Sequence, residues 1–191
     1  MEYRTLWIDL ETTGTDLRLH SIIQIAGIIE INEEVVETFN FKCRPTGICA
    51  NPVALENIGF SLEELSTWGD WRVAYDDFVT ILRKYIDPFD KEKIRFRLAG
   101  KNVRFDLSFL VDFFKLNGDQ YIFSYINGKQ QLEIGAIIDY CRYEGYINTP
   151  DSKLETIADH FGLEIKAHNA LSDIIVTRQI HRELRKKLKY N

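Results

Sequence analysis

The sequence predicts an α/β protein in which helices flank a central mixed sheet. The chain opens with three apolar, strand-like segments separated by short turns, which is the pattern of an antiparallel meander. Further along, short apolar runs alternate with helical periodicity, which is typical of parallel βα units. No repeat, low-complexity tract or Pro/Ser-rich linker interrupts the 191 residues, so we expect one domain over residues 1–191.

The predicted meander fills the start of the chain. Residues 6–10 are apolar apart from Asp9, which predicts a buried strand. Residues 21–31 are dense in Ile and predict the second strand, and Asn32-Glu33-Glu34 is typical of a hairpin turn. Val35, Glu37, Phe39, Phe41 and Cys43 would share one face of a strand, and all but Glu37 are apolar, so we expect residues 35–43 to form the third strand.

Helices and strands are predicted in alternation over the rest of the chain. Ser61 and Glu64 have the spacing of a capping box, so a short helix is expected to begin there after a loop. Ser152 and Glu155 have the same spacing and predict a second such helix, which ends at Gly162. The remaining elements are expected at residues 71–86 (helix), 94–99 (strand), 103–116 (helix), 131–135 (strand), a helix through Cys141, and 170–188 (helix).

Composition and charge narrow the class of protein. Hydrophobic residues make up 45% and charged residues 28%, which is an ordinary balance for a globular domain. No apolar stretch is long enough to span a bilayer. The three cysteines lack metal-ligand spacing, which favours reduced thiols and a cytoplasmic location. The net charge of −5 argues against a protein that coats nucleic acid by bulk electrostatics, but it is compatible with an enzyme that holds cations near a nucleic acid.

Two acidic residues end the first apolar run. Asp9 and Glu11 lie two positions apart, so on a strand their side chains project from the same face. Two adjacent carboxylates repel each other unless a cation lies between them, and hard oxygen ligands suit Mg²⁺ or Mn²⁺. The alternative is a turn that carries two solvated acids.

Three further titratable residues stand at element boundaries. Asp106 lies in the first turn of the predicted helix 103–116, where the helix dipole favours an acid whatever its function. Its apolar neighbours suggest a partly buried position, where an unpaired carboxylate is costly. Asp173 lies early in the last predicted helix, and His168 lies in the loop before it.

These acidic segments resemble the three motifs of the DEDD exonucleases, which are proofreading-type 3′→5′ exonucleases with a ribonuclease-H-like fold. Asp9-Leu10-Glu11 resembles their first motif, and Asn102-Val103-Arg104-Phe105-Asp106 resembles their second. The third corresponds to His168-Asn169-Ala170-Leu171-Ser172-Asp173, in the subgroup that uses His. The resemblance is to the group that contains the epsilon subunit of DNA polymerase III and RNase T, and it extends from residue 3 to about residue 185.

The resemblance implies a site for two divalent cations, Mg²⁺ or Mn²⁺. Asp9 would bridge the two ions, and Glu11 and Asp173 would complete the ligands of the first. Asp106 would act on the second ion, partly through water. His168 would deprotonate the attacking water, because an imidazole titrates near neutral pH.

The resemblance also implies a pocket for the terminal nucleotide. Thr12 and Thr13 would contact the terminal sugar through their hydroxyls or their backbone. Asn102 and Phe105 could line the same pocket, although helix capping and core packing are alternative roles for them. Residues 59–65 resemble a stretch that the proofreading branch carries between its first two motifs, where relatives often have His or Asn immediately before the glycine. This chain has Ile58 at that position, so an apolar contact with a base and plain packing both stay open.

The expected reaction is hydrolysis of phosphodiester bonds at the 3′ end of a single strand. DNA is the expected polymer, a DNA polymerase is a possible partner, and no membrane interaction is expected. An exoribonuclease is an alternative, because Trp7-Ile8-Asp9-Leu10-Glu11 is similar to the start of oligoribonucleases. A binding module that kept the fold without activity is a second alternative. Such a module is expected to lack one of the five site residues, and this chain has them all.

Overall fold

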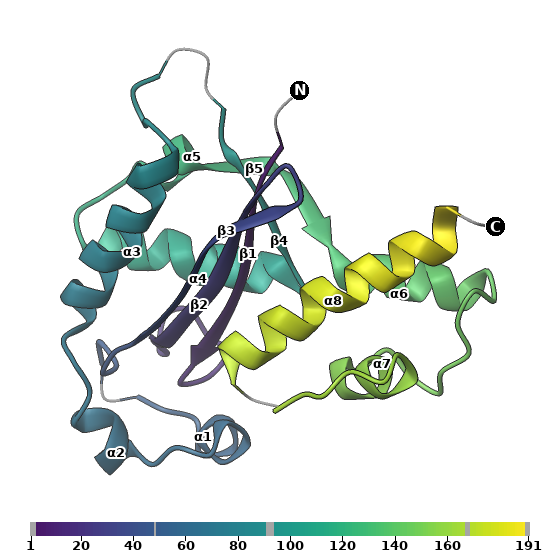
Figure 1. The fold of residues 1–191 in the computed structure, drawn as a ribbon. Coiled ribbons are helices and arrows are strands. Elements are labelled where there is room, and N and C mark those ends of the chain that lie inside the picture. Colours follow the sequence, from purple (N-terminus) through teal and green to yellow (C-terminus); the bar gives the residue numbers. More distant parts are fainter. Residues whose placement is uncertain (1–2, 48, 91–93, 167–168, 190–191) are drawn as a thin grey trace.

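A five-stranded mixed sheet lies between two groups of helices (Figure 1). The computed structural model describes residues 3–47, 49–90, 94–166 and 169–189. The strands are β1 (Arg4–Thr12), β2 (Ile22–Ile31), β3 (Glu34–Lys42), β4 (Phe96–Gly100) and β5 (Ile126–Glu133). The helices are α1 (Pro52–Ile58), α2 (Leu62–Ser66), α3 (Trp71–Tyr85), α4 (Val103–Leu116), α5 (Ile122–Tyr125), α6 (Ile134–Tyr143), α7 (Leu154–His160) and α8 (Ala170–Lys189).

The strand order β3-β2-β1-β4-β5 places β1 at the centre of the sheet. β1, β2 and β3 form the predicted antiparallel meander, and β4 and β5 join parallel to β1 through helical crossovers. Asn32 and Glu33 turn the β2–β3 hairpin with positive φ angles of 50° and 72°, as a two-residue hairpin turn requires. The chain therefore has the predicted α/β class with its mixed sheet.

The two faces of the sheet bury separate hydrophobic clusters. Leu6, Ile8 and Leu10 of β1 pack on one face with α3 and α4. Trp7 points to the opposite face, where α6, α7 and α8 contribute the second cluster. Figure 1 shows α8 crossing this second face obliquely. Because side chains alternate along a strand, the residues of β1 that follow Trp7 at steps of two also project towards α8.

Several predicted element boundaries are confirmed. The helix predicted over residues 103–116 is α4, and the last predicted helix is α8. The hydroxyl of Ser61 accepts the backbone N–H of Glu64 at 3.1 Å, as the predicted capping box requires.

Other predictions were wrong. The segment expected to be a loop before Ser61 contains α1, whose start is capped by the Asn51 side chain and whose first residue is Pro52. The capping box predicted at Ser152 is absent, because α7 begins after Lys153 and no side chain caps it. β5 begins at Ile126, earlier than the predicted strand 131–135, and the short helix α5 was not predicted.

No helix in the described ranges is long and apolar enough to cross a bilayer. Cys43, Cys49 and Cys141 are all free thiols, and two of them are buried.

Candidate active site

The side chains of Asp9 and Glu11 project from the end of the central strand towards α8. Strand β1 pairs with β2 along its whole length, and the pairing register shifts between Glu11 and Thr12. Such a bulge twists the strand locally and redirects the side chains beside it. Both carboxylates are only partly exposed, so they lie at the edge of the core rather than in bulk solvent.

Helix α8 brings a third carboxylate to the same place. Asp173 lies in its first turn, and one oxygen from each of Asp9, Glu11 and Asp173 lies within 4.8 Å of the other two. The side chain of Asn169 starts this helix by accepting the N–H of Ser172 at 3.1 Å. The sequence analysis gave Asn169 no role, although an Asn just before a helix is a recognised capping signal.

Asp106 approaches β1 from the opposite side of the sheet. Strand β4 ends at Gly100, where a Cβ atom would lie 2.8 Å from the carbonyl oxygen of Ile8, so only glycine fits this close approach. Asn102 then adopts a left-handed conformation, with φ of 62°, and α4 begins. The carboxylate of Asp106, 3% exposed, accepts the backbone N–H of Leu10 at 3.1 Å. This bond fixes Asp106 against the strand that carries the other acids.

Glu133 is a structural residue that the sequence analysis missed. Its Oε1 accepts the N–H of Asn102 at 2.8 Å and that of Gly135 at 3.0 Å, and its Oε2 accepts the N–H of Val103 at 2.9 Å. One carboxylate therefore caps the starts of both α4 and α6, where the helix dipoles favour negative charge. It thereby positions the first turn of α4, which carries Asp106.

The clustered acids hold their protons more tightly than isolated carboxyl groups. Burial, followed by the charges of Asp106, Glu11 and Asp173, raises the pKa of Asp9 well above its usual value, and the nearby Lys101 opposes this shift. Burial and the charge of Asp173 raise the pKa of Glu11 to about 7. Burial raises the pKa of Asp106 to about 8, although backbone N–H groups partly offset the effect.

This cluster has the chemistry of a divalent-cation site. Three converging carboxylates repel one another in a partly buried setting, and a bound cation would remove that cost. The donor set contains only hard oxygens, which suits Mg²⁺ and Mn²⁺. A shallow cavity of about 240 Å³ opens over Asp9 and Asp173, and Lys101 and Lys153 also line it. An anionic substrate would therefore meet both positive side chains and any bound cations.

The hydroxyls of the two predicted sugar-binding residues form hydrogen bonds within the protein. The Thr13 side chain is fully buried, and its hydroxyl donates to the carbonyl of Cys49 at 3.1 Å and accepts the N–H of Ser21 at 3.0 Å. The Thr12 hydroxyl donates to the carbonyl of Gly14 at 2.7 Å. Both hydroxyls thus shape the turn after β1, and the hydroxyl of Thr13 is not available to a substrate.

The other predicted contacts lie nearer the surface. Asn102 is exposed and precedes α4, but its side chain makes no capping bond, because Glu133 accepts the N–H groups there. Phe105 is half-buried and packs on Phe109 with ring centroids 4.7 Å apart. Ile58 is half-buried at the end of α1. His168, the predicted base, lies outside the described residues.

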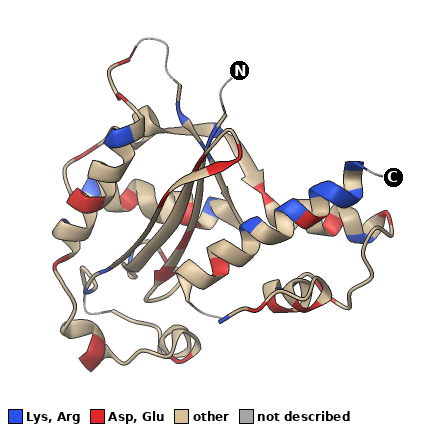
Figure 2. Cartoon of the chain, in the orientation of Figure 1, with Lys and Arg blue, Asp and Glu red and all other residues tan. Residues whose placement is uncertain are grey.

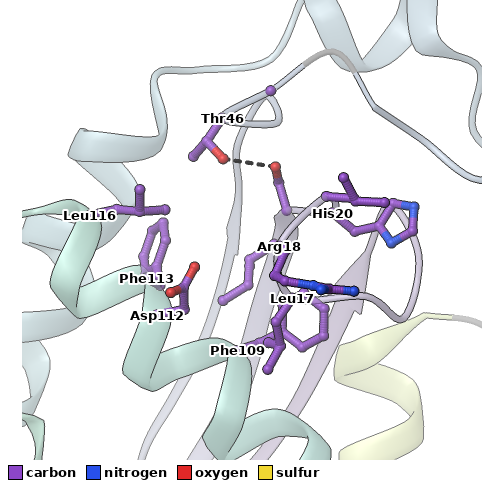
Figure 3. Close-up of a pocket in the computed structure, with 12 residues that line it drawn as sticks. Leu17, Arg18, His20, Thr46, Phe109, Asp112, Phe113 and Leu116 are labelled. Carbon is purple, nitrogen blue, oxygen red and sulfur yellow. Dashed lines mark hydrogen bonds between the residues drawn. The ribbon is translucent and has the colours of Figure 1, made fainter.

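A second depression lies beside the turn after β1, and none of the clustered carboxylates lines it. It has a volume of about 160 Å³, and Figure 3 shows Phe109, Asp112 and Phe113 of α4 facing the loop that holds Leu17 and His20. Asp9 and Asp173 instead line the cavity over β1 and α8.

The comparisons with known proteins decide the family. Residues 6–180 match the family described as Exonuclease. The chain belongs to this exonuclease family. The predicted membership of the DEDD exonucleases and the ribonuclease-H-like fold are thus confirmed, whereas the subgroup of the epsilon subunit stays a prediction. Members of this family use divalent metal ions. No curated protein sequence matches the chain.

Solved structures of Exonuclease I from E. coli share the fold of this exonuclease. The complex with a dT13 oligonucleotide has a TM-score of 0.80 and 21% identity, over 98% of this chain and 42% of that chain. The product-bound structure has a TM-score of 0.79 and 21% identity, over 99% and 45% of the two chains. The zinc-bound complex with single-stranded DNA has a TM-score of 0.78 and 22% identity, over 100% and 41%. This chain therefore spans less than half the length of those Exonuclease I chains.

Proposed function

We propose that this chain is a metal-dependent 3′→5′ exonuclease that shortens single-stranded DNA and releases nucleoside 5′-monophosphates. The observation that carries the proposal is the convergence of Asp9, Glu11 and Asp173 within 4.8 Å of one another, in a chain of the exonuclease family. A phosphodiester is anionic and resists attack by hydroxide, so its hydrolysis requires neutralisation of charge and activation of water.

The carboxylates have distinct proposed roles. Asp9 would bridge two Mg²⁺ or Mn²⁺ ions, because it lies near the end of the central strand, and Glu11 and Asp173 would complete one set of ligands. Asp106 would serve the second ion, partly through water; its carboxylate is already held by the N–H of Leu10. Bound cations would supply charge neutralisation and acidify water. His168 would take the proton from the attacking water.

The proposal also includes the substrate polymer, its contacts with the protein, a protein partner and the cellular location. The Exonuclease I structures with oligonucleotides contain single-stranded DNA, which supports a DNA substrate for a domain of the same fold. Lys101 and Lys153 beside the carboxylates would contact the substrate phosphates. Asn102, Phe105, Ile58 and the turn at Thr12 are the candidates that surround the terminal nucleotide. A DNA polymerase partner and a cytoplasmic location, where thiols stay reduced, complete the proposal.

A matched pair of 5′-labelled oligonucleotides tests direction and polymer together. DNA and RNA strands of one sequence are incubated with the purified protein and Mn²⁺. A ladder of progressively shorter labelled products is expected from 3′→5′ hydrolysis of the DNA strand, and EDTA should stop it. Immediate release of a labelled mononucleotide would indicate the opposite direction, and faster shortening of the RNA strand would indicate an exoribonuclease.

A second arm of the experiment assigns the activity to the cluster. Asp9→Asn keeps the shape of the side chain but removes its charge, so it should abolish the ladder. Asp76→Asn removes one charge from the exposed face of α3 and serves as the matched control. Equal activity in the Asp9→Asn variant and the control would overturn the proposed site.

A further inference from the structure

A separate cavity lies at the other end of β1 from the catalytic carboxylates. It has a volume of about 400 Å³ and opens between the β2–β3 turn, β4 and the second half of α8. Tyr3, Trp7, Arg97, His181 and Arg185 are among the residues that line it. Figure 1 shows that the N-terminus of the chain emerges at this end of the sheet. The cavity shares no lining residue with the cavity over Asp9 and Asp173, although Trp7 lies only two positions before Asp9 on β1.

Two hydrogen-bond donors in its wall lack acceptors. Trp7 is only 1% exposed, and among the described residues nothing accepts a hydrogen bond from its indole N–H. The Nε of Arg97 is also buried and has no acceptor in the same part of the chain. Buried donors are costly when unsatisfied, so such groups usually indicate a missing water, ion or ligand. Two of them on one cavity wall point to an acceptor-rich ligand.

The charges around the cavity leave one positive group without a counter-ion. Glu30 pairs with Arg178 at 2.5 Å, and Glu33 pairs with Arg185 at 2.8 Å, so both acids in the cavity wall are neutralised by α8. Arg97 forms no ion pair with any residue in the described ranges, and its guanidinium lies over the Tyr3 ring, 5.9 Å from the ring centroid. Figure 2 shows that Lys and Arg gather towards the C-terminal end of α8, and Arg185 of this part of the helix lines the cavity. The local field therefore favours an anion, although the net charge of the chain is −5.

The imidazole of His181 completes the wall. Its ring lies 5.2 Å from that of Trp7, and burial together with the charge of Arg185 lowers its pKa to about 4. The ring is therefore neutral near pH 7 and offers one donor and one acceptor. With Tyr3 and Trp7 it adds aromatic surface that suits a compact organic molecule.

We infer that this cavity is a second binding site, which takes a small oxyanion through Arg97 and the indole N–H of Trp7. The oxyanion is a phosphate or a carboxylate group, because either accepts several hydrogen bonds and pairs with a guanidinium. Arg97 is partly exposed and, like Trp7, lines the cavity, so a ligand in the cavity lies beside both side chains. The site does not depend on the proposed exonuclease activity.

NMR spectroscopy of the indole N–H groups tests this inference directly. The chain has three Trp residues, so three indole signals are expected, and a Trp7→Phe variant assigns the signal of Trp7. Inorganic phosphate, dAMP and citrate are titrated separately at constant ionic strength, with EDTA present so that the catalytic carboxylates stay free of cations. A saturable shift of the Trp7 signal, with the other two indoles unchanged, is the expected result. A stronger response to phosphate and dAMP than to citrate would identify a phosphate site, and the reverse a carboxylate site.

Charge-neutral variants distinguish a defined site from general attraction to the basic helix. Arg97→Gln should weaken binding by about tenfold or more. Lys186→Gln removes one charge from the exposed face of α8 without lining the cavity, so binding should be unchanged. Melting temperatures of both variants verify that they fold. Arg97→Lys retains the charge but loses the planar donors, so it should bind with intermediate affinity. The inference is overturned if no probe produces a saturable Trp7 shift or if both Gln variants bind equally.

Discussion

Without bound cations, the carboxylate cluster should destabilise the folded protein as the pH rises. Burial and the charge of Asp173 raise the pKa of Glu11 from 4.5 to about 7. The folded state therefore binds the Glu11 proton more tightly than the unfolded state. The stabilisation from this group is complete below about pH 4.5 and is lost as the pH rises through about 7. Since one pKa unit corresponds to about 1.4 kcal/mol, the loss amounts to about 3 kcal/mol at about pH 8.

A Glu11→Gln substitution removes this titration while keeping the size of the side chain. In EDTA at about pH 8, the free energy of unfolding should rise by about 3 kcal/mol. For a chain of this length the melting temperature should rise by about 6–12 °C. The gain should shrink to about 1 kcal/mol at about pH 5, where the folded wild-type protein keeps the Glu11 proton. Urea denaturation followed by circular dichroism at both pH values measures these differences.

A control variant and added cations test whether the carboxylate cluster causes this pH dependence. Glu34→Gln removes an exposed carboxylate at the start of β3 and should leave the pH profile unchanged. Adding Mg²⁺ or Mn²⁺ at about pH 8 should stabilise the wild-type protein more than Glu11→Gln, because the variant has lost a ligand. A Glu11→Gln variant with the wild-type pH profile in EDTA would refute the claim that the cluster is under electrostatic strain.

Three further substitutions probe the site. Asp173→Asn should reduce hydrolysis of a labelled oligonucleotide by more than about a thousandfold, equivalent to about 4 kcal/mol of activation free energy, with the circular dichroism spectrum unchanged. Glu133→Gln loses an acceptor for backbone N–H groups, so the free energy of unfolding, measured in urea, should fall by about 1–3 kcal/mol. Because Asp106 is then displaced, kcat should fall by a larger factor than KM rises. Lys101→Met removes a cation beside Asp9, so KM for DNA should rise and its dependence on the logarithm of salt concentration should become shallower by about 0.7.

A specific result would contradict each of these three predictions. Measurable turnover by Asp173→Asn near the wild-type rate would remove Asp173 from the cation site. Wild-type stability of Glu133→Gln would show that the starts of α4 and α6 do not depend on this carboxylate. An unchanged salt dependence of Lys101→Met would show that Lys101 does not contact the substrate phosphates.

Local rules were sufficient to predict the carboxylates that lie close together in the sequence. Asp9 and Glu11 share a face because a strand alternates its side chains, and this required only recognition of the strand. Their proximity to Asp173 depends on how α8 crosses the sheet, which no local pattern specifies. The family resemblance supplied this long-range information, because it identified Asp106 and Asp173 as partners of the first two acids.

The missed features depend on contacts between distant parts of the chain or on weak signals. Glu133 caps N–H groups about 30 residues earlier in the chain, so the sequence around it gives no indication of that role. The first half of β5 contains Asn-Gly-Lys-Gln and is largely exposed, because an edge strand needs no apolar pattern on both faces. Helix α1 could have been predicted, since Asn51-Pro52 is a helix start and Gly59 follows its end with φ of 71°.

The fold holds the clustered acids close together, so their mutual repulsion persists in the folded protein. A bound cation would relieve this repulsion, which favours cation binding. Asp9 and Glu11 belong to a strand with neighbours on both sides, and the N–H of Leu10 holds Asp106 against that strand. Moving the backbone of Asp173 away from the strand would require a shift of α8, which would expose Ile174, Ile180 and the other buried residues of its inner face. Since exposing each such side chain costs about 1.5–3 kcal/mol, moving the helix costs more than the repulsion it would relieve. Protonation of the acids or binding of a cation relieves the repulsion at a lower free-energy cost than moving α8. Above about pH 7 Glu11 is deprotonated, so only a cation relieves the repulsion there.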